Sequence, residues 1–341
     1  MPDQIVSSVT VHRARPDFDT GSLAGETVAV LGYGNLGRAA ALNLRDSGLK
    51  VRIGNRDDAC AHDARADGFD VVPIGTAARD DVVFVLLPDE VMAEVFATDI
   101  APALRPGSAV AFASGYCLAF GLVRPPETVD VLLVAPRMAG VAARSRYVAG
   151  QGFWACIGVE ADRSGRGRAR MLGLASALGA LRVGAIEISA ATEAALDLFV
   201  EQTIGPLLGA AVMAAFEIGR DAGMPPEALV MEMYMSGEME AVFEGFRTTG
   251  FFRASEAHGP TALFGGMIRT LELDREALAE RFRGVLGEIL SGTFAQRFQQ
   301  EARDDYPMLG VARQLMNSRS PLTEAERALR QAAGLPDPST S

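Results

Sequence analysis

Val28-Ala-Val-Leu-Gly-Tyr-Gly-Asn-Leu-Gly37 is a short apolar run that ends in three glycines and leads into the Ala-rich segment 38–45. This pattern predicts a buried strand, a tight turn and a helix whose first free N–H groups point at a bound phosphate. Gly32 would turn the chain, Gly34 would let the backbone approach a pyrophosphate, and Gly37 would let the helix pack on the strand. Because a second strand pattern follows the helix, we expect a dinucleotide site rather than a glycine-rich turn without a ligand.

Composition and charge exclude several classes of protein. The chain has 341 residues, of which 49% are hydrophobic and 22% charged, as is ordinary for a folded globular protein with room for two domains. Its net charge of −11 argues against nucleic-acid binding, which needs a concentrated basic face. Lys50 is the only lysine, so catalysis through a lysine Schiff base is close to excluded.

Cysteine usage and apolar run length bear on the compartment. The three cysteines show neither CxxC nor zinc spacing, which fits a reducing environment. We find no signal-peptide pattern, and the longest apolar run, about 203–216, is shorter than the ~20 residues of a membrane span. We expect this run to be a core helix. The protein should therefore be cytoplasmic and bind neither membranes nor nucleic acid.

Two patterns of hydrophobicity divide the chain. From residue 26 to 189, short β-rich runs alternate with Ala-rich helical stretches. This alternation predicts parallel βαβ units, that is, a Rossmann-type α/β domain with helices on both faces of the sheet. From residue 190 onward the pattern predicts long helices and hence an all-α domain. The expected domains are 1–189 and 190–335, followed by a frayed tail at 336–341.

The expected strands fix where a ligand would lie. They fall near residues 27–31, 51–55, 71–74, 81–87, 109–113, 130–135, 155–160 and 182–188. The helices of the second domain are expected near residues 192–221, 225–246, 262–272, 274–290, 293–303 and 323–333. Ligands on such sheets bind beyond the carboxyl ends of the strands. The residues expected to bind the cofactor are Gly32, Tyr33, Gly34, Asn35, Leu36, Gly37, Asn55, Arg56, Asp57, Leu87, Pro88, Ser114 and Gly140.

The loop after the second predicted strand bears on the choice of cofactor. Arg56 could stack on adenine, and Asp57 or Asp58 could accept hydrogen bonds from the ribose hydroxyls. Acidic side chains near the 2′ position repel the additional phosphate of NADP, which favours NADH. Arg56 argues in the opposite direction, so NADH is favoured and NADPH remains the alternative.

Three carboxylates on the predicted helices suggest a metal. Asp197 and Glu201 lie four residues apart and so share one face of an apolar helix, where a cation would have to compensate them. Glu232, on the next helix, could complete the site. Oxygen ligands without histidine or thiolate favour Mg²⁺ or Mn²⁺ over zinc. The alternative, acids that are solvated or paired with arginines, is weighted equally.

Longer motifs occur in one order over about residues 20–270. They are 30–37, 41–48, 86–95 (Leu-Leu-Pro-Asp-Glu-Val-Met-Ala-Glu-Val), 100–107, 131–136, 197–202 (Asp-Leu-Phe-Val-Glu-Gln) and 258–262. Through these motifs the chain resembles the ketol-acid reductoisomerase family in its short-chain class I form. Members convert acetohydroxy acids to dihydroxy acids with a nicotinamide cofactor and two Mg²⁺. The resemblance implies a Rossmann domain, an all-α domain of the 6-phosphogluconate dehydrogenase-like type, and a homodimer with intertwined helical domains.

The resemblance also assigns the metal ligands. Asp197 would bridge both metals, Glu201 would serve the first, and Glu232 would serve the second. The remaining glutamate of the family falls at Ser236, which cannot supply negative charge or carry a proton as a carboxylate does. One of the two metal sites should therefore be impaired, and we expect at most one Mg²⁺.

Three further positions depart from the family pattern. The active-site histidine of the family falls at Ser114, its lysine at Arg137, and a substrate-binding serine at Gly259. Arginine keeps the charge but lacks the compact, easily desolvated ammonium of lysine. Ser114, Tyr116 and Ser236 are candidates for hydrogen bonding to the substrate, and His258 is a weaker candidate proton donor. The catalytic candidates are Asp197, Glu201, Glu232, Ser114, Arg137, Ser236 and His258.

These departures bear on the reaction. Alkyl migration needs a two-metal clamp with an acid and base, whereas hydride transfer needs an oriented nicotinamide and a group that polarises the acceptor. We therefore expect an NAD(P)H-dependent reductase that acts on a small ketone, keto acid or imine without isomerisation, in a specialised biosynthetic pathway. Two alternatives stay open: an authentic Mg²⁺-dependent reductoisomerase of branched-chain amino acid biosynthesis, and a cofactor-binding homologue without activity. The apolar helical half predicts a homodimer.

Overall fold

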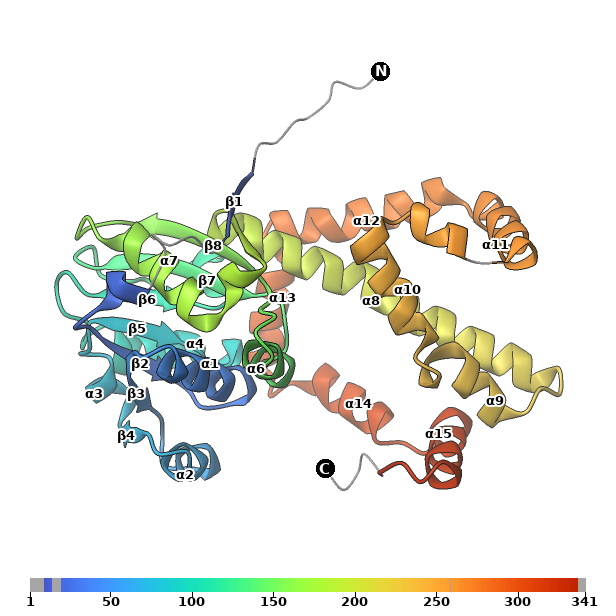
Figure 1. Cartoon of the computed structure of the whole chain (residues 1–341), viewed down its shortest axis with the longest axis horizontal. Coiled ribbons are helices and arrows are strands. Elements are labelled where there is room, and N and C mark those ends of the chain that lie inside the picture. Colours follow the sequence, from blue (N-terminus) through green and yellow to red (C-terminus); the bar gives the residue numbers. More distant parts are fainter. Residues whose placement is uncertain (1–8, 14–19, 258, 337–341) are drawn as a thin grey trace, which may run out of the picture. The chain divides into compact units, whose positions relative to one another are not determined.

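The computed structural model describes residues 9–13, 20–257 and 259–336. Contacts divide the chain into two compact units, Met1–Asp197 and Leu198–Ser341, which are described separately (Figure 1). Among the described residues, the strands of the first unit form one nine-stranded sheet in the order β1-β9-β8-β7-β6-β5-β2-β3-β4. The strands are β1 Thr10–His12, β2 Thr27–Leu31, β3 Lys50–Gly54, β4 Asp70–Val72, β5 Val82–Val85, β6 Ala109–Phe112, β7 Asp130–Pro136, β8 Trp154–Ala161 and β9 Gly184–Glu187.

The sheet is mixed, so the expectation of parallel βαβ units throughout was wrong. One part of the sheet is a parallel series, made of β4, β3, β2, β5, β6 and β7. Strand β8 pairs antiparallel with β7. After β7 the chain forms helix α6 (Gly140–Val148) and re-enters the sheet with Ala155 opposite Pro136. It thus turns back at the carboxyl end of β7 without crossing to the amino end, which forces antiparallel pairing.

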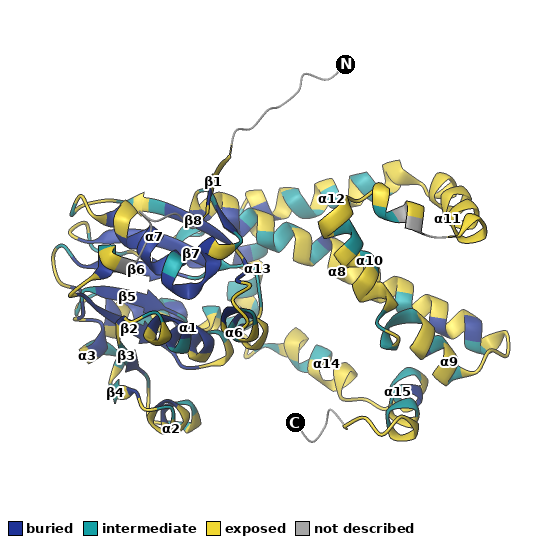
Figure 2. Cartoon of the chain, in the orientation of Figure 1, coloured by how far each residue is buried: buried dark blue, intermediate teal, exposed yellow. Residues whose placement is uncertain are grey.

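The short strand β1 was not predicted because three residues show no usable alternation. It pairs antiparallel with β9, and His12 Nε2 lies 2.7 Å from Glu187 Oε2. The central strands β2, β5 and β6 are buried along their whole length, as expected where helices cover both faces of a sheet (Figure 2). The helices of this unit are η1 Thr20–Leu23, α1 Asn35–Asp46, α2 Ala59–Ala66, α3 Ile74–Ala77, α4 Asp89–Val95, η2 Phe96–Ile100, α5 Tyr116–Ala119, α6, α7 Gly167–Leu178 and η3 Ala180–Arg182.

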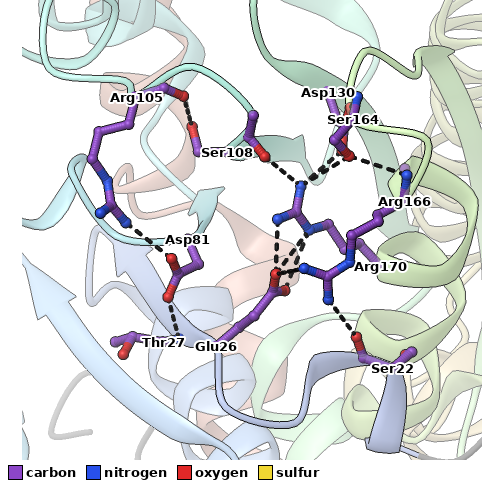
Figure 3. Close-up of polar contacts among 12 residues, drawn as sticks. Ser22, Glu26, Thr27, Asp81, Arg105, Ser108, Asp130, Ser164, Arg166 and Arg170 are labelled. Atoms are coloured by element: carbon purple, nitrogen blue, oxygen red, sulfur yellow. Dashed lines mark hydrogen bonds and ion pairs between the residues drawn. The ribbon is translucent and has the colours of Figure 1, made fainter.

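A buried ionic network ties the amino ends of the strands together (Figure 3). Arg170 of α7 donates from Nε and Nη2 to Glu26, and from Nη1 to Asp130 and the carbonyl oxygen of Gly107. Burial alone would raise the pKa of Asp130, but hydrogen bonds from Ser164, from backbone N–H groups and from Arg170 hold it below its ordinary value. This network links the segments that precede β2, β6 and β7.

The second unit is helical. Its elements are α8 Ala190–Asp221, which begins in the first unit, α9 Pro226–Val230, η4 Met231–Met235, α10 Glu238–Thr249, η5 Arg253–Ala257, α11 Pro260–Glu272, α12 Arg275–Leu290, α13 Thr293–Arg303, α14 Pro307–Met316 and α15 Pro321–Ala332. The helix expected at 225–246 is interrupted by the π-helical turn η4 and by Gly237, whose φ is +83°. A left-handed residue cannot continue an α-helix, so α10 starts anew after it.

Helix α8 is apolar but not buried within the single chain, so the expectation of a core helix was wrong. Only 6% of its most apolar 18-residue stretch is buried (Figure 2). By length and composition alone it is the one helix in the described part of the chain that could cross a membrane. In the described part of the second unit, the buried apolar residues are Phe216, Val230, Ile289, Ala295 and Ala325. Its small core cluster includes Phe216 of α8, but it leaves most of the apolar stretch of that helix uncovered.

Candidate active site

The glycine turn between β2 and α1 is sterically determined at two of its three glycines. Gly32 has φ +94°, and a Cβ there would lie 2.7 Å from the carbonyl oxygen of Leu86. A Cβ on Gly37 would lie 2.1 Å from the carbonyl oxygen of Gly32, so the helix can approach the strand only with glycine at this position. By contrast, a Cβ on Gly34 would meet no atom within 4 Å. The space above Gly34 is open to a ligand.

A cavity of about 340 Å³ lies against this turn, at the carboxyl ends of β2, β5 and β6. Its walls are formed by Gly34, Asn35, Leu36, Gly37, Val85, Leu86, Leu87, Pro88, Asp89, Met92, Phe112, Ala113, Ser114 and Cys117. Gly34 is the N-cap of α1 and provides no side-chain cap, so the first N–H groups of the helix remain available to a phosphate. The cavity and the uncapped helix fit a dinucleotide.

Of the residues expected to bind the cofactor, seven line this cavity. The seven are Gly34, Asn35, Leu36, Gly37, Leu87, Pro88 and Ser114. Gly140 opens α6, and a Cβ there would lie 2.1 Å from the carbonyl oxygen of Asn35, so it permits close contact between two helix starts. Tyr33 donates its backbone N–H to Asn55 and its hydroxyl to Asp67 at 2.7 Å. Burial raises the pKa of Tyr33, and the hydrogen bond to Asp67 raises it further. The phenol therefore stays protonated and can keep donating the hydrogen bond that supports the turn.

The loop after β3 is held by Asp58, which caps α2. Its carboxylate accepts hydrogen bonds from Ala61 N, Asn55 Nδ2 and Arg56 Nε, the last at 2.7 Å. The contact with Arg56 is the main cause of the lowered pKa of Asp58. Asp57 is 81% exposed and pairs with Arg65. Arg56 is therefore already bound to a carboxylate, and the acidic side chain at the loop surface is Asp57.

A second cluster lies where β7 ends, and it joins the predicted candidates Arg137 and Asp197 to Glu193, which was not predicted. Arg137 follows Pro136 and donates from Nη1 to Asp197 Oδ1 at 2.6 Å and from Nη2 to Glu193 Oε1. Glu193 is completely buried, and its other oxygen accepts the N–H of Gly115 at 2.6 Å. Burial raises the pKa of Glu193, while Arg137 and the Gly115 N–H partly offset this. The only sequence signal for Glu193 was its place in the first turn of a helix.

Asp89 is another wall residue, at the end of the strand-end segment Leu87-Pro88-Asp89 that was expected to lie near the cofactor but without an assigned role. It begins α4, and Cys117 Sγ donates to its carboxylate over 3.6 Å. Burial raises the pKa of Asp89, and burial together with Asp89 raises the pKa of the Cys117 thiol. The thiol is thus kept protonated and is not suited to be a nucleophile.

The three expected metal ligands are spread over α8 and η4. Asp197 is 40% exposed and bound to Arg137, and Glu201 is exposed one helical turn later. Glu232 is exposed on the π-helical turn and borders an apolar cavity of about 560 Å³ in the second unit. Within the ranges that the structure describes, no three His, Cys, Asp or Glu side chains are grouped closely enough to hold a metal. These carboxylates suit Mg²⁺ in kind, and the triad stays a prediction.

The remaining candidates lie elsewhere. Ser236 is exposed after η4, and its Oγ accepts the N–H of Glu238. Gly259 is the N-cap of α11. Tyr116 is buried at the start of α5 and packs edge-on against Phe120. His258 lies outside the described residues.

Comparison with known proteins bears on both units. The family model "Acetohydroxy acid isomeroreductase, NADPH-binding domain" matches residues 22–184, and "Ketol-acid reductoisomerase, C-terminal domain" matches residues 191–334. The ketol-acid reductoisomerase (NADP(+)) of Pyrobaculum arsenaticum is 38% identical over 291 residues, which cover 84% of this chain and 88% of that protein. The enzyme of the same name from Pyrobaculum neutrophilum is 36% identical, with the same coverage.

A solved structure extends the similarity to three dimensions. The NADH-preferring ketol-acid reductoisomerase from an uncultured archean has a TM-score of 0.88 and 31% sequence identity, and the match covers 95% of this chain and 98% of that one. The resemblance inferred from the motifs and the expected two-part fold are thereby confirmed. The chain belongs to the ketol-acid reductoisomerase family and is an NAD(P)H-dependent oxidoreductase with a Rossmann-like domain followed by the family's helical domain.

Proposed function

We propose that this member of the family reduces a small keto acid, ketone or imine with NAD(P)H and does not migrate an alkyl group. The observation that carries the proposal is the guanidinium of Arg137 on Asp197. In the family pattern Asp197 would bridge two metals, but here a fixed cation already occupies one of its oxygens. A single positive group can polarise an acceptor, whereas migration draws on two metals. We place the reaction in a specialised biosynthetic pathway.

The residues around the cavity would have three roles: binding the pyrophosphate, orienting the nicotinamide and hydrogen-bonding the acceptor. The glycine turn and the N-terminus of α1 would hold the pyrophosphate, and the cavity wall of Leu87, Pro88 and Ser114 would orient the nicotinamide. When bound, the reduced cofactor supplies a hydride to the C=O or C=N carbon, and a proton on the heteroatom completes the alcohol or amine. Ser114 and Arg137 would hydrogen-bond the acceptor, and Tyr116 and Ser236 are further candidates for this role.

One Mg²⁺ remains part of the proposal. Asp197 and Glu201 share a face of α8 and would supply two ligands, with Glu232 as the third. Such an ion, when bound, supplies Lewis-acid polarisation of the acceptor oxygen. In an intertwined dimer the pocket, and with it this site, could be built from both chains. The exposed apolar face of α8 supports a homodimer with intertwined helical units, in the cytoplasm.

NADH is the favoured cofactor. Both Arg56 and Asp57 are exposed and paired, with Asp58 and Arg65 respectively, and of the two we expect Asp57 to repel a 2′-phosphate. The structural relative with a TM-score of 0.88 prefers NADH, which supports this choice, whereas the two Pyrobaculum relatives are named for NADP(+). A ratio of NADH to NADPH efficiency below one would overturn the preference.

The names of the relatives favour a second candidate, an authentic ketol-acid reductoisomerase. The deciding experiment follows NADH and NADPH oxidation with 2-acetolactate and, separately, with 3-hydroxy-3-methyl-2-oxobutanoate, each with and without Mg²⁺. Reduction of the second substrate alone supports the proposal, because that compound is already rearranged. Turnover of acetolactate to the dihydroxy acid overturns it in favour of the second candidate. Dinucleotide binding without reduction of these or of other ketones and imines would indicate an inactive homologue.

A further inference from the structure

We propose that a cavity beside α15, at the turn that follows α14, binds a small organic polyanion, either a phosphate ester or a polycarboxylate. The cavity has a volume of about 630 Å³, and both helices belong to the second unit (Figure 1). It shares no residue with the cofactor cavity. The inference therefore goes beyond the proposed reaction and does not depend on it.

The charge of the cavity wall is opposite to that of the chain. Arg319, Arg327 and Arg330 line the cavity together with one carboxylate, Glu326, whereas the chain as a whole has a net charge of −11. Within residues 9–13, 20–257 and 259–336, none of these three guanidinium groups takes part in an ion pair. Arg330 has one long contact, 3.5 Å from Nη1 to the carbonyl oxygen of Pro336. The positive charge of the wall is thus available to an anion.

The arginines of α15 lack these ion pairs although acids lie at helical spacing. Glu324 lies three residues before Arg327, and Glu326 lies four residues before Arg330. Acid and base commonly pair at both spacings, and α10 and α12 each contain such a pair. Instead, Glu326 Oε1 accepts the hydroxyl of Tyr234, on η4, at 2.6 Å. Burial and this hydrogen bond raise the pKa of Tyr234, so the hydroxyl keeps its proton and engages the acid in place of an arginine.

The chemistry of the wall defines the class of ligand. A guanidinium presents a planar fork of N–H donors that matches the oxygens of a carboxylate or a phosphate, and three of them suit a ligand with two or more negative charges. Gln331 adds a neutral hydrogen-bonding group, and Met316 and Leu335 add apolar surface that an organic ligand would cover. The volume is in the range of sites for small organic molecules.

Isothermal titration of the full-length protein with inorganic pyrophosphate and, separately, with citrate tests the site. Saturating NADH keeps pyrophosphate out of the cofactor cavity, and Mg²⁺ is omitted. We expect at least one probe to bind with a Kd below about 1 mM. Tighter binding of pyrophosphate assigns the site to phosphate esters, and tighter binding of citrate assigns it to polycarboxylates. Binding of neither probe overturns the proposal, whatever the protein reduces.

Substitution of the arginines locates the bound probe. Arg327→Gln and Arg319→Gln should each raise the Kd about tenfold, as expected for the loss of a hydrogen bond between charged groups. Both side chains are exposed, so the melting temperature without probe should not change. Arg327→Lys keeps the charge but loses the planar fork, and it should raise the Kd roughly threefold.

Arg313→Gln is the matched control. Arg313 is exposed on α14, forms no ion pair with any described residue, and does not line the cavity. Its substitution should leave the Kd within about twofold. An equal rise of the Kd in Arg313→Gln and Arg327→Gln would mean that the probes are attracted to positive charge without a site, and would overturn the proposal.

Two variants on the acidic side of the cavity should have opposite effects. Glu326→Gln removes the negative charge of the wall, while its amide oxygen can still accept the Tyr234 hydroxyl, so the Kd should fall about threefold. Tyr234→Phe releases Glu326 to pair with Arg330, so the Kd should rise about threefold. A higher Kd in Glu326→Gln would place the anion elsewhere and contradict the proposed site.

Discussion

Two buried arginine clusters lie at opposite ends of the same sheet, and they differ in how completely they are paired. At the amino ends of the strands, Arg170 is 5% exposed and every guanidinium nitrogen has an acceptor (Figure 3). At the carboxyl ends, Arg137 is 26% exposed, and its Nε has no hydrogen-bond partner within the described part of the chain. The closed cluster has nothing left to offer a ligand, whereas the open one is hydrogen-bonded to Gly115, the neighbour of Ser114 on the cavity wall. The comparison indicates that one arginine serves the fold and the other the chemistry.

The largest effect is expected at the closed cluster. Arg170→Met would leave the carboxylates of Glu26 and Asp130 buried without their cation, at a cost of about 3–5 kcal/mol in the free energy of unfolding. Urea denaturation followed by circular dichroism measures this cost. The fraction that remains folded should bind NADH with the wild-type Kd. A higher Kd for NADH in the fully folded variant would contradict the distinction between the two ends of the sheet.

Arg137→Met should have the opposite effect, a large loss of kcat with a small loss of unfolding free energy. Because Arg137 is partly exposed and Glu193 keeps the N–H of Gly115, we expect a smaller loss of unfolding free energy than in Arg170→Met and a drop in kcat of about 100-fold. Steady-state kinetics and urea denaturation on one preparation compare the two quantities. A variant that melts early but turns over normally would make Arg137 structural as well.

Gly34→Ala tests the open side of the cavity without touching charge. Its Cβ would meet no protein atom, so the melting temperature should stay within a few degrees, while the Kd of NADH rises about tenfold. Isothermal titration with NADH gives the Kd. Unchanged affinity would indicate that the pyrophosphate does not approach Gly34.

The smallest expected effect is a loss of stability at low pH. The folded-state pKa of Asp130 lies below its ordinary value near 3.9, so its ionised form contributes stability that is present above about pH 4. This contribution is lost as the pH falls through the lower folded-state pKa. Urea midpoints from pH 7 to pH 3 should fall more steeply for the wild type than for Asp130→Asn. Parallel curves would mean that another carboxylate dominates acid unfolding.

Local structure was predictable from the sequence, and long-range structure was not. The glycines of the turn at 32–37 lie within ten positions of one another, so the turn and the cavity beside it could be predicted, whereas the close approach of Gly32 to Leu86 could not. The reversal at β8 depends on where α6 ends, which hydrophobic alternation does not record. Helix α14 was missed; it follows two residues with positive φ, Asp305 and Tyr306, and contains Gly310.

The candidate site was likewise predictable only where it depends on local sequence. Residues 34–37 and 87–88 were predicted to surround the cofactor and do line the cavity. The pairing of Arg137 with Glu193 joins residues 56 positions apart. It exists because the ends of β6 and β7 both meet the first turn of α8, a meeting that no spacing in the sequence reveals. The metal triad also needs long-range placement and stays a prediction.

Because the apolar face of α8 is uncovered in the single chain, the stability of the helical unit should depend on protein concentration. A unit with so few buried apolar residues of its own gains much of its stability on association, so dilution should lower its melting temperature. The sheet, whose central strands are buried within the single chain, should melt at a temperature independent of concentration. In a thermal scan at nanomolar protein the two halves would separate into two transitions, and at high concentration they would merge.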